Sequence, residues 1–239
     1  MPLAEAVVMA AGVGSRMRPL SDAYAKPVLP IDGRPVLAAL LHELSSASVE
    51  RAYVVVGHHA RQVEALAGDG SAWGLAVTVV AQPEPLGSAD AVARALDAGA
   101  RPPLLVSAAD TVYAPGAVAR FVAAWERTGA DGAVAWRAAS PRVAEKNRIG
   151  VRDGLVLRVP ASDRSGPHVA APLWVLGAAA AARLRNDSAP WELGNAFQAA
   201  IDSGVRVAAV EVGATRDLTS PVDLLRENFA YLEGLERRA

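Results

Sequence analysis

A glycine-rich turn near the N-terminus holds the residues best suited to binding an anion. An apolar run that begins at Ala6 predicts a buried strand, and the chain then turns through Gly12 and Gly14. Glycine has no β-carbon, so the backbone there can turn tightly and direct several N–H groups at one anion. Arg16 follows Gly14 by two residues, and Lys26 follows it by twelve. Backbone amides with an arginine and a lysine beside them can bind a polyphosphate.

Two common phosphate-binding loops do not match this turn. The P-loop pattern needs a Lys-Ser or Lys-Thr pair after its second glycine, and the sequence has none. The dinucleotide-binding pattern needs a third glycine where Met17 stands. A glycine turn that only joins a strand to a helix is the simpler alternative. Lys26 argues against it, because the chain has only one other lysine, Lys146, and an ammonium is a compact charge suited to a phosphate oxygen.

The turn and the segment around Lys26 together resemble the signature of a known family. The pattern G-x-G-[ST]-R-[LM]-x-P-L-T, followed by P-K-P-[ML]-[LV]-P, is that of the sugar-1-phosphate nucleotidyltransferases, the NDP-sugar pyrophosphorylases. Ser21 stands where the family usually has threonine, and Ala25 stands where it has proline. Neither departure removes a group that could bind phosphate, so the resemblance is specific.

The resemblance implies roles for the residues of this segment. Arg16 and Lys26 are expected to be catalytic, with Arg16 at the β- and γ-phosphates and Lys26 at the α-phosphate of a nucleoside triphosphate. The turn is expected to bind the nucleotide through Ala10, Ala11, Gly12, Val13, Gly14 and Ser15.

Composition limits the class of protein. The chain has 239 residues, of which 52% are hydrophobic and 21% charged, so it can bury a sizeable core as one domain. A net charge of −1 argues against a general nucleic-acid or membrane-surface binder, and no apolar run reaches the ~18 residues of a membrane span. The N-terminus lacks a basic region, so we expect no signal peptide and a cytoplasmic protein. The absence of cysteine excludes disulfides and thiolate metal sites.

Strands and helices alternate along the first half of the chain. Apolar runs predict strands at 51–57, 75–80 and 103–107, and helical periodicity predicts helices at 35–47, 61–67 and 88–98. This alternation indicates a parallel sheet covered on both faces. We therefore expect an α/β fold, and the resemblance implies a Rossmann-like, doubly wound, mixed but mostly parallel sheet in three αβα layers. Ligands of such sheets bind beyond the carboxyl ends of the strands.

The second half is less regular. It predicts helices at 115–127, 191–203 and 221–237, strands at 132–137, 169–176 and 205–210, and a hairpin at 149–159. We expect a single nucleotidyltransferase domain, with residues 1–137 as the nucleotide-binding half and residues 138–239 as the acceptor-binding half and closing helix.

Residues 82–91 follow the predicted third strand and form a second motif. They are similar to the family pattern Q-x-x-x-x-G-[TS]-A-x-A, which implies that Gln82 and Gly87 read the nucleobase and that Ser88 belongs to the nucleotide site. An amide offers both a donor and an acceptor to a base edge, and a glycine lets the ring approach the backbone. The alternative is a proline-rich loop in which Ser88 caps the next helix.

Two aspartates are candidate ligands of Mg²⁺. Asp110 follows the predicted strand 103–107, and a carboxylate there can hold a hard cation that also binds substrate phosphates. Asp217 opens a segment similar to the family pattern D-x-G-T-P-x-D-L, which implies that it is the second ligand, although Thr219 replaces the glycine. The alternative for Asp110 is a turn or capping residue. Asp223 is better explained as an acid in the first turn of a helix.

The acceptor side carries the weakest motifs. Gly150 resembles the glycine of the family pattern [YF]-G-x-[VI], which lies against the acceptor. The E-K-P element that contacts the sugar phosphate in the family is absent. Lys146 or Arg148 could bind the acceptor phosphate instead, or belong to a solvated basic loop.

These patterns favour nucleotidyl transfer from a nucleoside triphosphate to a phosphorylated small molecule, with Mg²⁺ as cofactor. The expected product is an NDP-sugar made from a sugar 1-phosphate, with release of pyrophosphate. Two alternatives stay open: a cytidylyltransferase acting on a non-sugar phosphate such as phosphocholine, and a nucleotide-binding regulatory module without catalysis. A glycosyltransferase would need a D-x-D tripeptide, which the sequence lacks. We expect no nucleic-acid or membrane partner, and the sequence leaves the base, the acceptor and the oligomeric state open.

Overall fold

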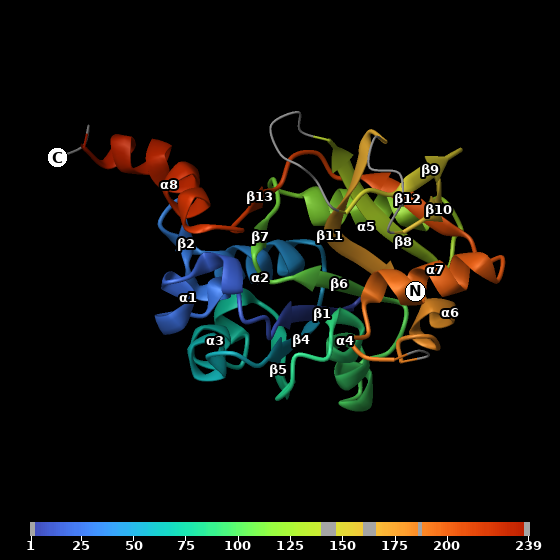
Figure 1. Cartoon of the computed structure of the whole chain (residues 1–239), viewed down its shortest axis with the longest axis horizontal. Helices are drawn as coiled ribbons and strands as arrows, with labels where there is room; N and C mark the ends of the chain where they lie inside the picture. The colour runs from blue at the N-terminus through green and yellow to red at the C-terminus, as the bar shows by residue number, and fades with distance from the viewer. Residues whose placement is uncertain (1–2, 140–146, 160–165, 186–187, 237–239) are drawn as a thin grey trace.

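One nine-stranded sheet runs through the computed structural model, which describes residues 3–139, 147–159, 166–185 and 188–236 (Figure 1). The strand order is β5-β4-β1-β6-β11-β8-β12-β10-β9. The strands are β1 (Glu5–Ala10), β4 (Arg51–Val56), β5 (Ala76–Ala81), β6 (Leu104–Ala108), β8 (Gly132–Ala138), β9 (Gly150–Arg152), β10 (Leu155–Arg158), β11 (His168–Leu176) and β12 (Val207–Glu211).

The sheet is mixed, with most strands running in one direction. β1 pairs in parallel with β4 and β6, β4 pairs in parallel with β5, and β8 pairs in parallel with β12. β11 is antiparallel to both β6 and β8, and β10 is antiparallel to both β12 and β9. β11 and β10 therefore oppose the other strands of the described sheet, which confirms the predicted mixed, mostly parallel sheet.

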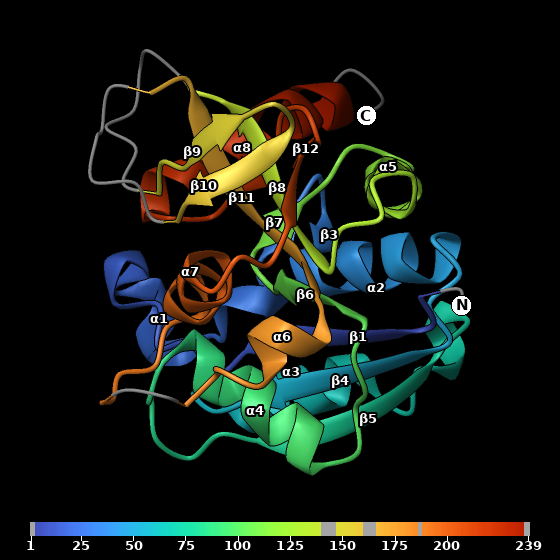
Figure 2. The same cartoon turned by 90° about the vertical axis from the view of Figure 1, so that its right-hand side faces the viewer.

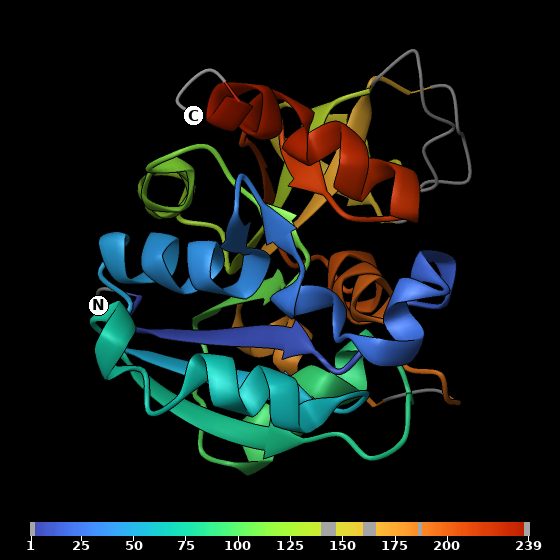
Figure 3. The same cartoon turned by 90° about the vertical axis from the view of Figure 1, so that its left-hand side faces the viewer.

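Helices cover both faces of the sheet (Figures 2 and 3). Neighbouring residues of a strand face opposite sides, so Val8 of β1 packs into one hydrophobic cluster and Val7 packs into the other. The first cluster includes helices α2 (Val36–Ser46), α3 (Ala60–Ala67) and α5 (Ala117–Glu126). The second includes α4 (Ser88–Asp97), α6 (Ala178–Ala181) and α7 (Leu193–Asp202). The three-layer αβα architecture is thereby confirmed.

The predicted hairpin and closing helix are present. Asp153 and Gly154 connect β9 to β10 and both have positive φ, as a two-residue hairpin turn requires. The closing helix α8 (Pro221–Glu236) packs beside the small hairpin of β2 (Pro30–Ile31) and β3 (Arg34–Pro35), and it projects from the body of the molecule in Figure 1. No described helix is long and apolar enough to cross a membrane.

Short elements around the carboxyl end of β1 were not predicted. They are the 3₁₀ turns η1 (Ser15–Met17) and η2 (Lys26–Val28), the helix α1 (Leu20–Ala23), and a second two-stranded sheet of β7 (Thr111–Val112) and β13 (Arg216–Asp217). A further 3₁₀ turn, η3 (Ser71–Trp73), precedes β5. The β7–β13 pairing joins segments from opposite halves of the sequence.

Candidate active site

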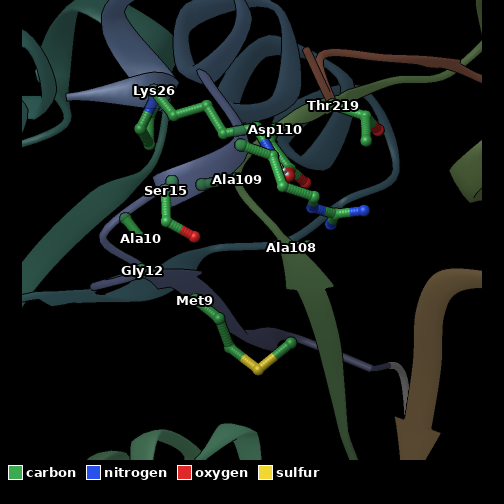
Figure 4. Close-up of a pocket in the computed structure, with 12 residues that line it drawn as sticks. Met9, Ala10, Gly12, Ser15, Lys26, Ala108, Ala109, Asp110 and Thr219 are labelled. Atoms are coloured by element: carbon green, nitrogen blue, oxygen red, sulfur yellow. Dashed lines mark hydrogen bonds and ion pairs between the residues drawn. The ribbon is translucent and has the colours of Figure 1, made fainter. Parts of the chain in front are cut away.

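The glycine turn follows β1 and lines a cavity of about 240 Å³ (Figure 4). Gly14 has a φ of +64°, a conformation that favours glycine, and its carbonyl accepts a hydrogen bond from the Met17 amide at 2.7 Å. At Gly12, a β-carbon would meet no heavy atom within 4 Å, so internal packing does not require glycine there. The open space beside Gly12 is instead available to a ligand. Ser15, Arg16 and Lys26 line the same cavity.

Lys26 reaches the cavity from the first residue of η2. Its ammonium forms an ion pair with Asp110 Oδ2, and Figure 4 shows the two side chains pointing toward one another. The Lys26 side chain is only 14% exposed, so its charge is held at a fixed place beside the glycine turn. Arg16 lies on the surface and lines the cavity as well. The structure thus brings together the two cations that the sequence predicted to act on the phosphates.

The β7–β13 pairing brings Asp110 and Asp217 to the same place. Asp110 precedes β7, and Asp217 pairs in register with Thr111 of β7. Thr111 Oγ1 donates a hydrogen bond to Asp217 Oδ1 at 2.6 Å, and Thr215 Oγ1 donates to Oδ2 at 2.9 Å. The Leu218 amide donates to the Asp110 carbonyl at 3.3 Å. Two acids that lie 107 positions apart in the sequence are therefore neighbours.

The surroundings of Asp217 oppose its negative charge. Burial raises the pKa of Asp217 above the ordinary aspartate value, and the charge of Asp110 adds to that rise. Hydrogen bonds from Thr111 and Thr215 and the charge of Arg137 lower the pKa without cancelling the rise. A divalent cation beside Asp110 and Asp217 would offset the cost of burying the Asp217 charge and the repulsion between the two carboxylates.

This pair of acids fits a Mg²⁺ ion that also binds phosphate oxygens. Mg²⁺ commonly uses one or two carboxylates together with substrate phosphates and water, rather than a cage made only of protein groups. The described residues contain no cluster of three or more histidine, cysteine, aspartate or glutamate side chains that could hold a metal. The donor set therefore suits a metal that arrives with a nucleotide, and the metal role of Asp110 and Asp217 stays a prediction.

A second cavity, of about 680 Å³, adjoins the first. The two share Arg16, Lys26 and Asp110, and Asp217 lines the larger one. The larger cavity extends away from the glycine turn to residues that the sequence did not single out: Arg137, Asn147, Trp174, Glu192 and Asn195. These residues come from β8, the segment before β9, β11 and the start of α7, and share no motif, so no sequence signal could have grouped them.

The predicted base-reading loop lies between β5 and α4. Gln82 is buried, and its Nε2 donates to the Gly87 carbonyl at 3.0 Å and to Asp90 Oδ2 at 2.9 Å. Asp90 is buried too and forms ion pairs with Arg94 at 2.7 Å and Arg185 at 2.9 Å. These contacts fix the loop and the orientation of the Gln82 amide. Neither Gln82 nor Gly87 is among the residues that line the two cavities, so their role in base recognition stays a prediction.

Gly87 and Ser88 attach this loop to the segment before α7. A β-carbon on Gly87 would lie 2.1 Å from the Trp191 carbonyl oxygen, so only glycine permits this approach. Ser88 Oγ donates to Glu192 Oε2 at 2.5 Å and accepts from the Leu193 amide at 2.8 Å. Ser88 makes no side-chain cap of α4, so the capping alternative is wrong. Ser88 lines the larger cavity, which places it near the predicted nucleotide site.

The structure gives less support to the predicted acceptor residues. Gly150 lies in β9, at the edge of the sheet, and is not among the residues that line either cavity. Lys146 lies outside the described residues. Arg148, the other cation considered for the acceptor, donates to the Gly166 carbonyl and lines neither cavity. The acceptor roles of Gly150 and Lys146 stay predictions.

A glycine turn, two cations and two converging acids beside a mostly parallel sheet are the arrangement that the sequence predicted for a nucleotide-binding transferase. A profile of the nucleotidyl transferase family matches residues 5–151. Glucose-1-phosphate thymidylyltransferase of Streptomyces griseus is 30% identical over 243 residues, which cover 98% of this chain and 68% of that protein. N-acetylmuramate alpha-1-phosphate uridylyltransferase of Neisseria meningitidis is 38% identical over 113 residues, covering 45% of this chain and 47% of that protein.

Solved structures share the fold. UDP-glucose pyrophosphorylase of Acinetobacter baumannii superposes with a TM-score of 0.80 at 18% identity, covering 99% of this chain and 97% of that one. The inositol-1-phosphate CTP transferase of T. maritima superposes with a TM-score of 0.81 at 20% identity, covering 98% and 96%. Likenesses at this level of identity concern the fold alone. The sequence matches show that this chain belongs to the nucleotidyl transferase family, in its sugar-1-phosphate branch. The family predicted from the glycine turn is confirmed.

Proposed function

We propose that this protein transfers a nucleoside monophosphate from a nucleoside triphosphate to a sugar 1-phosphate, releasing pyrophosphate, with Mg²⁺ bound by Asp110 and Asp217. One observation carries the proposal: the glycine turn, Arg16, Lys26 and both acids border two adjoining cavities. Had these side chains faced separate cavities, the motif alone would have carried little weight. The named activities of the thymidylyltransferase and uridylyltransferase relatives support the choice of a sugar 1-phosphate as acceptor.

The smaller cavity provides the triphosphate site. The backbone amides of residues 12–15 and the guanidinium of Arg16 bind the β- and γ-phosphates, and the ammonium of Lys26 binds the α-phosphate. In the protein without substrate the Lys26 ammonium pairs with Asp110, so nucleotide binding replaces this ion pair by a contact between the ammonium and the α-phosphate. A bound Mg²⁺ supplies positive charge to the phosphate oxygens.

The chemical step is an in-line displacement at the α-phosphorus. A phosphate oxygen of the sugar 1-phosphate forms a bond to that phosphorus, and the bond to the bridging oxygen of pyrophosphate breaks. Negative charge increases on the oxygens around the α-phosphorus, which is where Lys26 stabilises it. The protein forms no covalent bond to either substrate, so its contribution is positioning and charge neutralisation.

We propose that Gln82 contacts the base, and its hydrogen bonds then favour some bases over others. The Gly87 carbonyl and the Asp90 carboxylate are both acceptors, so the Gln82 atom facing them is the amide nitrogen, and both of its N–H groups are used. Gln82 Oε1 accepts no hydrogen bond from the described residues, and it is not among the buried polar atoms without a partner. It therefore offers an acceptor to a ligand. A ring N–H of uracil, thymine or guanine complements it, as does the exocyclic amino group of cytosine or adenine. The named thymidylyltransferase and uridylyltransferase relatives favour thymine or uracil.

Pyrophosphate release from a matrix of substrates tests the proposal. UTP, dTTP, GTP, CTP and ATP are each paired with glucose 1-phosphate, mannose 1-phosphate, N-acetylmuramate 1-phosphate and phosphocholine, with Mg²⁺ or with EDTA. We expect metal-dependent release with UTP, dTTP or GTP and a sugar 1-phosphate. Release only with CTP and phosphocholine would favour the cytidylyltransferase alternative. Nucleotide binding without release for any pair would favour a regulatory module.

A further inference from the structure

The larger cavity brings a third cation to the site. Among the residues that line the two cavities, the positively charged ones are Arg16, Lys26 and Arg137. Arg16 and Lys26 line both cavities, whereas Arg137 lines the larger one alone. The positive charge therefore divides into a pair that lines both cavities and one arginine that lines the larger cavity alone.

Arg137 belongs to a central strand of the sheet, which fixes the position of its backbone. It lies near the end of β8 and pairs in register with Val169 of β11, which lines the same cavity. Arg137 and both proposed metal ligands, Asp110 and Asp217, line this one cavity. A partly buried arginine on a central strand presents a guanidinium fork in a restricted set of positions, which favours recognition of a phosphate or carboxylate by paired hydrogen bonds.

The charges of the cavity show why a cation is needed there. Asp110, Glu192 and Asp217 all line the larger cavity. An acceptor phosphomonoester adds about −1.5 to −2 charges near neutral pH and must approach a triphosphate that is itself negative. Arg16 and Lys26 serve the triphosphate in the proposed function. Besides the proposed Mg²⁺, Arg137 is the remaining cation among the described residues of the two cavity linings that the acceptor phosphate could use.

We propose that Arg137 binds the phosphate of the acceptor substrate. This inference rests on the proposed function and replaces the missing E-K-P element with a residue from a different strand. It restricts the acceptor to phosphomonoesters whose phosphate reaches Arg137 and the α-phosphorus together. The rest of the acceptor then extends toward Glu192 and Asn195, where polar groups can bind hydroxyls.

Steady-state kinetics of Arg137→Gln and Arg137→Lys test this assignment. In Arg137→Gln we expect the KM for the sugar 1-phosphate to rise about 10- to 100-fold, because one charge-assisted contact is lost, while the KM for the nucleoside triphosphate stays within about twofold. Arg137→Lys keeps the positive charge but loses the paired N–H groups of the guanidinium. Its KM for the sugar 1-phosphate should therefore lie between those of the wild type and Arg137→Gln. Arg152→Gln is the matched control, since Arg152 lies exposed in β9 and lines neither cavity.

Calorimetric titration of the nucleotide and melting curves separate binding from folding. Unchanged nucleotide affinity with a raised acceptor KM supports the assignment. An unchanged acceptor KM in Arg137→Gln, or an equal rise in both KM values, overturns it. If Arg137→Gln does not fold, the acceptor KM of Arg137→Lys decides in the same way. A wild-type protein that is inactive with every sugar 1-phosphate would instead refute the proposed function.

Discussion

Replacing Asp217 by asparagine should stabilise the metal-free protein while abolishing its Mg²⁺-dependent activity. Asp217 is partly buried and faces the charge of Asp110, and both effects raise the pKa of its carboxyl group. An acid whose pKa is higher in the folded chain binds more protons when folded, so stability falls as the pH rises above about 3.9. At pH 7 the folded protein therefore carries an unfavourable charge, which asparagine removes at nearly the same volume.

The size of the effect follows from the contacts that remain. Thr111 Oγ1 can still donate to the amide oxygen of asparagine, and Thr215 Oγ1 can accept from its nitrogen, so neither hydrogen bond need be lost. Relief of one unfavourable charge is worth about 0.5–2 kcal/mol. For a chain of 239 residues this raises the Tm by about 1–8 °C.

Melting curves in EDTA at several pH values provide the assay. The difference in Tm between variant and wild type should be largest near pH 7 and shrink as the pH falls, because a growing fraction of the wild-type carboxyl is then protonated. Mg²⁺ with a nucleoside triphosphate should raise the Tm of the wild type more than that of the variant, which keeps the glycine turn, Arg16 and Lys26 but has lost one proposed metal ligand.

Asp110→Asn is the matched comparison. It removes the partner of the largely buried Lys26 ammonium, so its Tm should not rise. A lower Tm for Asp217→Asn than for wild type at pH 7, with a difference that does not change with pH, would refute this account of the site.

Two further substitutions test the phosphate site and the loop that carries Gln82. Lys26→Ala should lower kcat in the pyrophosphate assay by at least about 10²–10³-fold while the melting curve shows an intact fold, and near-normal turnover would remove its role at the α-phosphate. Gly87→Ala should lose about 1–3 kcal/mol more stability than Gly99→Ala. Both glycines have positive φ, but an added β-carbon would lie 2.1 Å from the Trp191 oxygen at residue 87 and 3.7 Å from its nearest neighbour at residue 99. Equal losses in denaturant titrations would contradict the close approach.

Long elements were predictable because their periodicity is strong. The helix expected at 35–47 is α2 (Val36–Ser46), whose Leu37, Leu40, Leu41 and Leu44 are all buried. The strand expected at 51–57 is β4 (Arg51–Val56). Strands of two residues such as β7 and β13 carry no periodicity, and their pairing depends on segments that meet only in the fold. They could not be predicted from the sequence.

The residues of the candidate site likewise differ in whether a local sequence pattern predicts them. Gly12, Gly14, Arg16 and Lys26 lie within one local motif, so the sequence alone indicates that they act together. Arg137 contributes to the site through the register of β8 against β11, which no local pattern encodes. The site for the triphosphate can thus be predicted from the sequence more readily than the site for the acceptor.

The position of Asp217 depends on contacts outside the catalytic residues. Arg216, its neighbour in β13, forms ion pairs with Asp32 and Glu227 and also donates to the Glu227 carbonyl. Asp32 lies in the hairpin of the N-terminal half, and Glu227 lies in α8, so β13 is held between the two ends of the chain. The family profile ends at residue 151 and contains neither Arg216 nor Asp217. The second candidate metal ligand is therefore positioned by the segment that the profile does not cover, and a match to the profile alone does not establish a complete active site.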